Sequence, residues 1–305
     1  MNDKTEAADV ELDVAGLTDI GKHRERNEDQ FLVATMQRTL HVEASSDPDQ
    51  VGWLPGALRG HILLVADGMG GAAGGDIASR VAMRAIAEYL CNVMPIATGN
   101  TALSMRAPGS TMRPSTSPGV RQGLKSAIQR GDDEVRRAAQ EAGEQRMGTT
   151  LTMTYISWPQ LYVAHVGDSR AYLLRDDELV RLTTDHTYAE KLRERTSVAL
   201  DENSPWHHVL WNALGGDPRE AVEPELHRWQ LEPGDVVMLC SDGLTKHVQD
   251  QTVAKVLHRA ASAEEACKRL VKKAIDDGGS DNVTVVVARC VQSESASEAP
   301  TVKRR

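Results

Sequence analysis

Aromatic side chains are scarce in this chain: they make up 4% of its 305 residues, and Phe31 is the sole phenylalanine. A folded core must therefore consist mainly of Val, Leu, Ile, Ala and Met, which suits packed sheets and helices. The hydrophobic content of 40% is ample for such a core, and the length fits one large domain or two small ones.

Cysteine is also rare, and the four cysteines include no close-spaced pair of the kind that binds zinc or undergoes redox exchange. We expect Cys91, Cys240, Cys267 and Cys290 to be small buried residues of a protein in a reducing compartment. No apolar run approaches the roughly 20 residues that span a bilayer, and Met1–Asp13 is polar and acidic, unlike a signal peptide. The expected location is the cytoplasm, without a membrane partner.

Several binding motifs are absent. The formal net charge of −9 argues against general binding to nucleic acids, which are captured mainly by clustered Lys and Arg. The glycine-rich stretch at 68–75 lacks the Gly-Lys-Ser/Thr ending of a phosphate-binding loop, so ATP binding is unsupported. The histidines in the motif-rich segments have neither helical ligand spacing nor an accompanying cysteine, so we expect structural roles for His165, His186, His207 and His208.

Apolar periodicity divides the chain into helical and strand-forming segments. Helical spacing covers 76–93 and about 120–143, whereas strand-like alternation dominates 149–182 and returns at 225–240 and 283–289. Short connections favour antiparallel neighbours. Long helices in two sequence clusters around many short strands therefore predict two layers of sheet covered by helices.

The two ends and one interior segment break this pattern. Residues 94–118 are rich in Pro, Ser, Thr and Gly, which predicts a mobile surface insertion. One continuous set of motifs fills the rest of the chain. We therefore expect a single domain at 13–290, between a flexible arm at 1–12 and a disordered tail at 291–305.

Two Asp-Gly pairs stand where apolar strands end. Asp67-Gly68 follows one such run and Asp242-Gly243 follows another. At this junction the carboxylate leaves the edge of a sheet from a rigid element, and glycine lets the backbone turn so that a ligand can come close. Asp-Gly on its own is more often an ordinary turn than a metal site.

Three further acidic clusters occur at the ends of predicted elements. Asp281 precedes the apolar run at 283–288, and Asp168 lies in a Gly-Asp-Ser turn. Glu28 and Asp29 belong to a polar cluster between two predicted strands. Together with the two Asp-Gly pairs, these clusters indicate one oxygen-rich metal site.

In this order, the motifs resemble the metal-dependent serine/threonine protein phosphatase family, protein phosphatase 2C or PPM, in its bacterial form. Met147–Thr150, Leu182–His186 and Asn212–Gly215 match further motifs of the family, and the resemblance runs from about Gly16 to about Arg289. It implies an α+β fold: a central β-sandwich of two mostly antiparallel sheets, flanked by helices on both sides, with the metal site at one edge. It also implies a flap that sets specificity.

The resemblance assigns the metal ligands residue by residue. Asp67 matches the carboxylate that bridges two ions, and the Gly68 carbonyl matches a ligand of one of them. Asp242 and Asp281 match the carboxylates that complete the shell of the second ion, and Asp168 matches a ligand of a third, weaker ion. Ligands that are all oxygen suit Mn²⁺ or Mg²⁺ rather than zinc.

The remaining site residues act around these ions. Arg24 matches the cation that binds the substrate phosphate, a task that its planar fork suits better than lysine would. Glu28 and Asp29 match acidic residues that act through waters or behind the ligands. The flap is expected at about 187–208.

Two departures from the family pattern bear on mechanism. Met69 stands where many eukaryotic members have a histidine that can protonate the leaving alkoxide. Lys246 stands where the family tends to carry an acidic residue. An ammonium there repels a divalent cation and can itself pair with Asp168, so we expect a third ion to bind more weakly than the main pair, or to be missing at low metal.

The implied activity is that of a phosphoprotein phosphatase in signal transduction, which hydrolyses phosphoserine and phosphothreonine monoesters with a metal-activated water. Its partners would be phosphorylated proteins, including a serine/threonine kinase and its substrates. A catalytically silent, phosphoprotein-binding module is the alternative, but such a module would be expected to lose Asp67, Asp242 or Asp281. Another metal-dependent phosphoesterase, such as a nuclease, is disfavoured by the acidic composition.

Overall fold

The computed structural model describes residues 10–43, 46, 52–70, 74–93, 119–144, 147–196, 200–201, 204–216 and 221–292. The predicted insertion at 94–118 lies outside these residues, as do most of the predicted arm and tail and part of the predicted flap.

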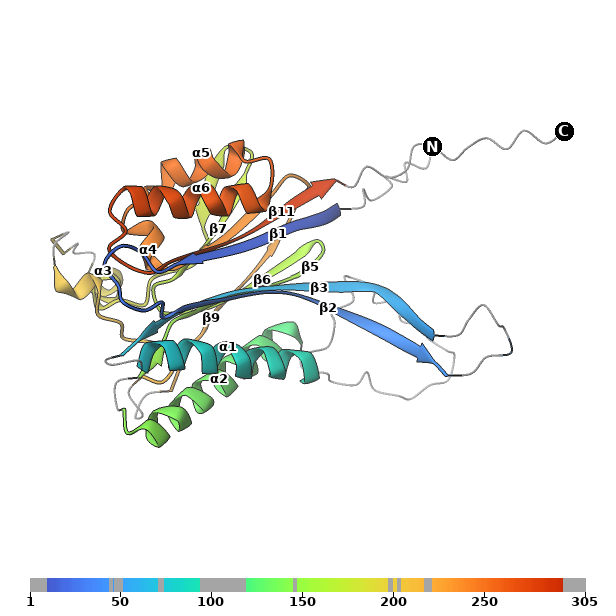
Figure 1. Ribbon diagram of the computed structural model, residues 1–305, viewed down its shortest axis with the longest axis horizontal. Helices are drawn as coiled ribbons and strands as arrows, with labels where there is room; N and C mark the ends of the chain where they lie inside the picture. The colour runs from blue at the N-terminus through green and yellow to red at the C-terminus, as the bar shows by residue number, and fades with distance from the viewer. Residues whose placement is uncertain are drawn as a thin grey trace.

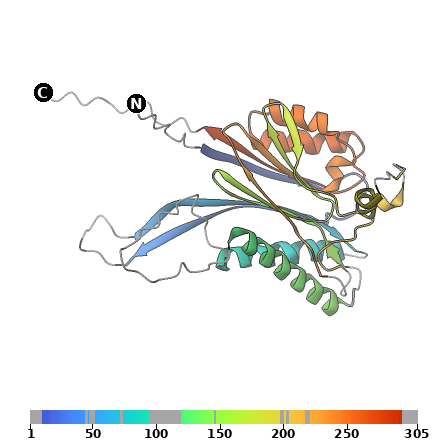
Figure 2. The ribbon, with the colours of Figure 1, turned by 180° about the vertical axis from the view of Figure 1, so that it is seen from behind.

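Two sheets form the centre of the molecule, and neighbouring strands in both run antiparallel. The first has the order β1 (Val10–Asp19), β11 (Val283–Gln292), β10 (Val236–Cys240), β7 (Arg170–Arg175) and β8 (Glu178–Arg181). The second has the order β2 (Asp29–Val42), β3 (Gly52–Met69), β5 (Leu151–Ser157), β6 (Gln160–Val166) and β9 (Glu225–Gln230), and the short β4 (Gly148–Thr149) pairs with the end of β3. The sheets face each other, as two opposite views show (Figure 1, Figure 2).

Helices cover both outer faces of this sandwich (Figure 1). The second sheet carries α1 (Gly74–Val93) and α2 (Val120–Ala142), and the first carries α5 (Asp250–Arg259) and α6 (Ala263–Asp276). The shorter elements α3 (Tyr188–Thr196), η1 (Pro205–His207) and α4 (Asp242–Thr245) gather at one end. The predicted α+β sandwich with helices on both sides is confirmed. No helix among the described residues is long and apolar enough to cross a membrane.

The apolar core has three layers because strand side chains alternate between the two faces of each sheet. In β3, Leu64 packs in the layer under α1 and α2, whereas Val65 packs between the sheets. In β11, Val285 packs in the layer under α5 and α6, whereas Val286 packs between the sheets. Since both faces of these strands are buried, their sequences are near-continuous apolar runs rather than alternating patterns.

Strand pairing reaches further than predicted at both ends of the domain. Val10 pairs with Gln292 across β1 and β11, so residues 10–12 and 291–292 belong to the first sheet rather than to an arm and a tail. The reason is that the backbone N–H and C=O groups of the two strand ends pair with each other, while Val10 and Leu12 pack against the layer between the sheets.

Candidate metal centre

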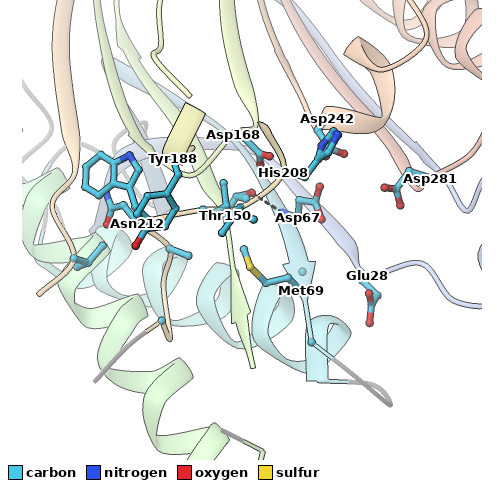
Figure 3. Close-up of a pocket in the computed structure, with 18 of the residues that line it drawn as sticks. Glu28, Asp67, Met69, Thr150, Asp168, Tyr188, His208, Asn212, Asp242 and Asp281 are labelled. Atoms are coloured by element: carbon cyan, nitrogen blue, oxygen red, sulfur yellow. Dashed lines mark hydrogen bonds between the residues drawn. The ribbon is translucent and has the colours of Figure 1, made fainter. Parts of the chain in front are cut away.

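Four aspartates from separate connections line one pocket at an end of the sandwich (Figure 3). Asp67 lies near the end of β3, Asp168 lies between β6 and β7, Asp242 opens α4 directly after β10, and Asp281 precedes β11. The pocket has a volume of about 960 Å³. The carboxylates expected to bind metal are thus brought together from distant parts of the sequence.

Two glycines allow this convergence. A Cβ atom on Gly243 would lie 1.9 Å from the carbonyl oxygen of Asn282, so only glycine lets α4 approach the loop that carries Asp281. A Cβ atom on Gly68 would lie 2.1 Å from the carbonyl oxygen of Gly75, at the start of α1. Each Asp-Gly pair therefore couples a carboxylate to a close backbone contact.

The backbone of Asp67 is held by two threonines. The Thr150 hydroxyl accepts a hydrogen bond from the Asp67 N–H at 3.0 Å, and the Thr149 hydroxyl donates to the Asp67 carbonyl at 2.9 Å. The Thr150 N–H donates to the same carbonyl at 2.9 Å. In the sequence, the only signal for this role was that both threonines belong to the Met147–Thr150 motif.

Asp29 links the two sheets beneath the pocket. It lies opposite Asp67 in the β2–β3 register and is buried. One of its carboxylate oxygens accepts hydrogen bonds from the hydroxyls of Ser241 and Thr284, both at 2.7 Å. Sequence reasoning missed these two hydroxyls, although Ser241 directly precedes Asp242 and Thr284 follows Asn282 by two residues. They tie the ends of β10 and β11 to β2.

Glu28 lines the pocket and joins the same elements through its backbone. Its N–H donates to the Asn282 side-chain oxygen at 2.8 Å, and its carbonyl accepts from the Gly68 N–H at 3.2 Å and from the Ser79 hydroxyl at 2.6 Å. Burial raises the pKa of the Glu28 carboxyl. The loop before β2 is therefore fixed against both β3 and the Asp281 loop.

Basic residues contact the aspartates on the solvent side. Arg24 Nε lies 2.7 Å from Asp281, and the Arg24 side chain is 48% exposed. Lys246 Nζ lies 2.6 Å from Asp242 and 2.7 Å from Asp281. The expected pairing of Lys246 with Asp168 is therefore wrong. Lys246 directly follows α4 with helical backbone angles, four residues after Asp242, which brings the two side chains together.

The carboxylates destabilise one another in the absence of a cation. Burial and the neighbouring aspartates raise the pKa of Asp67 well above its ordinary value. Burial, followed by the charges of Asp242 and Asp185, raises the pKa of Asp168 to about 7. Burial is also the main cause that raises the pKa of Asp29 to about 7.

The carboxylate oxygens at this end of the sandwich fit hard divalent cations. Among the described residues, Asp29 Oδ1 and Asp242 Oδ1 are buried and lack any hydrogen-bond partner. A cation bound by carboxylate oxygens would supply that partner and offset the mutual repulsion. Because every donor is an oxygen, the site suits Mn²⁺ or Mg²⁺.

A second titratable cluster lies behind the Asp168 turn and is structural. His165, His186 and Glu225 bring possible ligand atoms within 4.8 Å of one another. Both nitrogens of His165 already have partners, since Nε2 donates to the Thr184 carbonyl at 3.0 Å and Nδ1 lies 2.8 Å from the Thr152 hydroxyl oxygen. With both nitrogens engaged by protein groups, His165 has the structural role expected of it.

The model of the protein phosphatase 2C family matches residues 48–277. The chain belongs to this family. It is 35% identical over 241 residues to the serine/threonine protein phosphatase PstP of Mycobacterium tuberculosis, an alignment that covers 78% of this chain and 42% of PstP. It is 31% identical over 229 residues to the serine/threonine phosphatase Stp of Listeria innocua, which covers 74% of this chain and 83% of Stp.

Solved structures of protein phosphatase 2C relatives share the fold. The crystal structure of the PstP catalytic domain in complex with 2 manganese ions superposes with a TM-score of 0.67 at 31% identity, covering 92% of this chain and 99% of that one. The family resemblance and the fold expected from the motifs are confirmed. The manganese ions belong to that structure, whereas the pocket formed by Asp67, Asp168, Asp242 and Asp281 is this chain's own.

Proposed function

We propose that the protein is a phosphoprotein phosphatase that hydrolyses phosphoserine and phosphothreonine monoesters. The observation that carries the proposal is the convergence of Asp67, Asp242 and Asp281 in one pocket, where the buried Asp242 Oδ1 lacks a protein partner. Membership of the protein phosphatase 2C family supports it.

The cofactors in this proposal are two Mn²⁺ or Mg²⁺ ions and a weaker third. Asp67 would be shared by the main pair, the Gly68 carbonyl would complete one shell, and Asp242 and Asp281 would complete the other. Asp168 would hold the third. Bound there, the ions would supply positive charge for the phosphoryl oxygens and lower the pKa of a water so that it can attack phosphorus.

The remaining residues would orient the ligands and the substrate. Asp29 would hold the ends of β10 and β11 through Ser241 and Thr284, which fixes the separation of the carboxylates. Glu28 would act through waters at the pocket wall. Arg24 would bind phosphoryl oxygens, because its contact with Asp281 holds a half-exposed guanidinium fork at the pocket edge.

Met69 lines the pocket but carries no exchangeable proton. In the proposed reaction the serine or threonine oxygen that leaves phosphorus therefore takes its proton from water or from another group of the pocket, not from residue 69. This separates the chain from relatives with a histidine at this position.

The alternative, a silent phosphoprotein-binding module, is disfavoured because the chain keeps every carboxylate of the expected ligand set. The reaction that must supply the substrate is transfer of a phosphoryl group to a serine or threonine hydroxyl. The partners we propose are therefore phosphorylated proteins, including a serine/threonine kinase and its substrates.

The test is phosphate release from a phosphothreonine peptide by the purified full chain, with Mn²⁺ added and with Mn²⁺ chelated. The proposal expects turnover that is lost on chelation and restored by fresh Mn²⁺ or Mg²⁺. Binding of the phosphopeptide without release of phosphate, at saturating metal, would instead favour the silent module.

A further inference from the structure

The metal centre occupies only one end of its pocket. In Figure 3, Tyr188 lies across the pocket from Asp281, with Thr150 between them. Lys191 and Trp211 also line the pocket and lie beside Tyr188. A peptide whose phosphorylated side chain enters the aspartate end can therefore extend its neighbouring residues toward this second end.

Lys191 is held in place there by two aromatic rings. Its Nζ lies 4.2 Å from the centroid of the Trp211 ring and 5.7 Å from that of Tyr188, both within the range of cation–π attraction. Ring faces attract the positive charge but leave the N–H donors of the ammonium available for an oxygen acceptor. The half-buried Lys191 side chain is thus oriented before any ligand binds.

The other lysine and arginine side chains of the pocket already have carboxylate partners. Arg24 and Lys246 both contact Asp281, and Arg136 contacts Asp132. The Lys191 ammonium, by contrast, forms no ion pair with any residue in the described part of the chain. It is therefore the pocket cation that is free to meet an anionic group of a ligand.

We propose that Lys191 binds an acidic residue, Asp or Glu, that flanks the phosphorylated residue of the substrate. This inference rests on the proposed phosphatase function and adds a sequence preference to it. A carboxylate supplies the acceptors that the rings lack, and a preoriented ammonium loses little conformational freedom on binding it. Glu223 also lines the pocket and is exposed, so its charge opposes the same ligand.

The experiment compares phosphothreonine peptides that carry Glu or Gln at one position, scanned over both flanks, with Mn²⁺ at low ionic strength. For the wild-type chain we expect kcat/KM to be about fivefold higher for Glu than for Gln at one or two neighbouring positions. Lys191→Met keeps the apolar stem on Trp211 and should bring this ratio close to one. Lys191→Glu should invert it, and Glu223→Gln should increase it.

The ratio is taken within each variant, so a change in overall activity cancels. Lys125→Glu is the matched control, because Lys125 is exposed on α2, lies outside the pocket and undergoes the same change of charge. We expect Lys125→Glu to keep the wild-type ratio. An equal fall of the Glu-to-Gln ratio in Lys125→Glu and Lys191→Glu would mean that net charge sets the preference, and the proposed subsite would be wrong.

Two outcomes separate this inference from the function on which it rests. If the wild-type chain hydrolyses every peptide with Mn²⁺ but shows no Glu preference at any position, the subsite is overturned and the phosphatase function stands. If it hydrolyses neither the peptides nor p-nitrophenyl phosphate, the function fails and the inference fails with it.

Discussion

Lys246 Nζ lies 2.6 Å from Asp242 and 2.7 Å from Asp281, so one ammonium bridges two carboxylates of the expected ligand set. Burial lowers the pKa of Lys246, but the charges and hydrogen bonds of both aspartates outweigh it, and the net pKa is raised. The side chain is therefore cationic at neutral pH and competes with a divalent ion for the same oxygens.

We expect Lys246→Asp to lower the Mn²⁺ concentration needed for half-maximal activity by about tenfold, because it removes the competing cation and adds a ligand. Lys246→Met, which only removes the charge, should have a smaller effect in the same direction. Asp168→Ala should raise the Mn²⁺ requirement or slow turnover. Titration calorimetry on the metal-free proteins measures the Mn²⁺ affinities independently of activity. Three equally tight ions in the wild type would contradict the expected weak third ion.

Arg24 makes a different contribution, since its guanidinium should touch phosphate rather than an ion. Arg24→Ala should raise KM for a phosphothreonine peptide by about ten- to a hundredfold, because it removes one charge-assisted contact that is worth about 1.5–3 kcal/mol. Arg26→Ala is the control, because Arg26 is exposed on the same loop and does not line the pocket. An unchanged KM in Arg24→Ala would remove Arg24 from the substrate site. Because Arg24 also contacts Asp281, Mn²⁺ affinity is measured alongside.

A substitution at Gly243 tests whether the close approach of α4 to the Asn282 backbone sets the distance between the Asp242 and Asp281 carboxylates. In Gly243→Ala the new Cβ would lie 1.9 Å from the Asn282 carbonyl oxygen, which must push the Asp281 loop away from α4. We expect weaker Mn²⁺ binding by calorimetry and a loss of about 1–3 kcal/mol in the free energy of unfolding. Gly119→Ala should change neither, since nothing lies within 4 Å of a Cβ there. Wild-type Mn²⁺ affinity in Gly243→Ala would show that the site tolerates a wider separation.

The buried histidine behind the Asp168 turn predicts a pH effect on stability. Burial, followed by the nearby His186, lowers the pKa of His165 well below its usual 6.5. Below about pH 6.5 the unfolded chain therefore binds a proton that the folded chain does not, and stability is lost as the pH falls toward the folded pKa. In chelator, the free energy of unfolding of His165→Gln should fall less steeply with decreasing pH than that of the wild type, by about 1.4 kcal/mol per pH unit. Equal slopes would mean that His165 titrates normally.

Local sequence signals were sufficient for the carboxylates of the pocket. Asp67 and Asp242 stand where apolar strands end, and Asp281 stands just before one begins. Strand ends of one sandwich meet at its edges, so the convergence of the three follows from the fold class and the family order of the motifs. The α+β sandwich was also predictable, because apolar periodicity distinguishes helices from strands and the motifs follow the order of the family.

The contacts that hold the carboxylates in place were not predictable. Thr150 binds the Asp67 backbone, and Ser241 and Thr284 bind Asp29, through partners that are distant in the sequence. Hydroxyl groups of this kind leave no periodic signal. These pairings depend on how the two sheets stack, which local pattern does not specify.

The central claim is that Asp67, Asp242 and Asp281 hold the metal ions of a phosphatase. The most direct measurement combines turnover with metal content. Phosphate release from a phosphothreonine peptide and bound Mn²⁺ per chain are measured for the wild type, Asp67→Asn and Asp242→Asn, with folding checked by circular dichroism. We expect Mn²⁺-dependent turnover in the wild type, and folded variants that have lost both turnover and bound Mn²⁺. Substantial turnover with wild-type Mn²⁺ content in either folded variant would contradict the assignment.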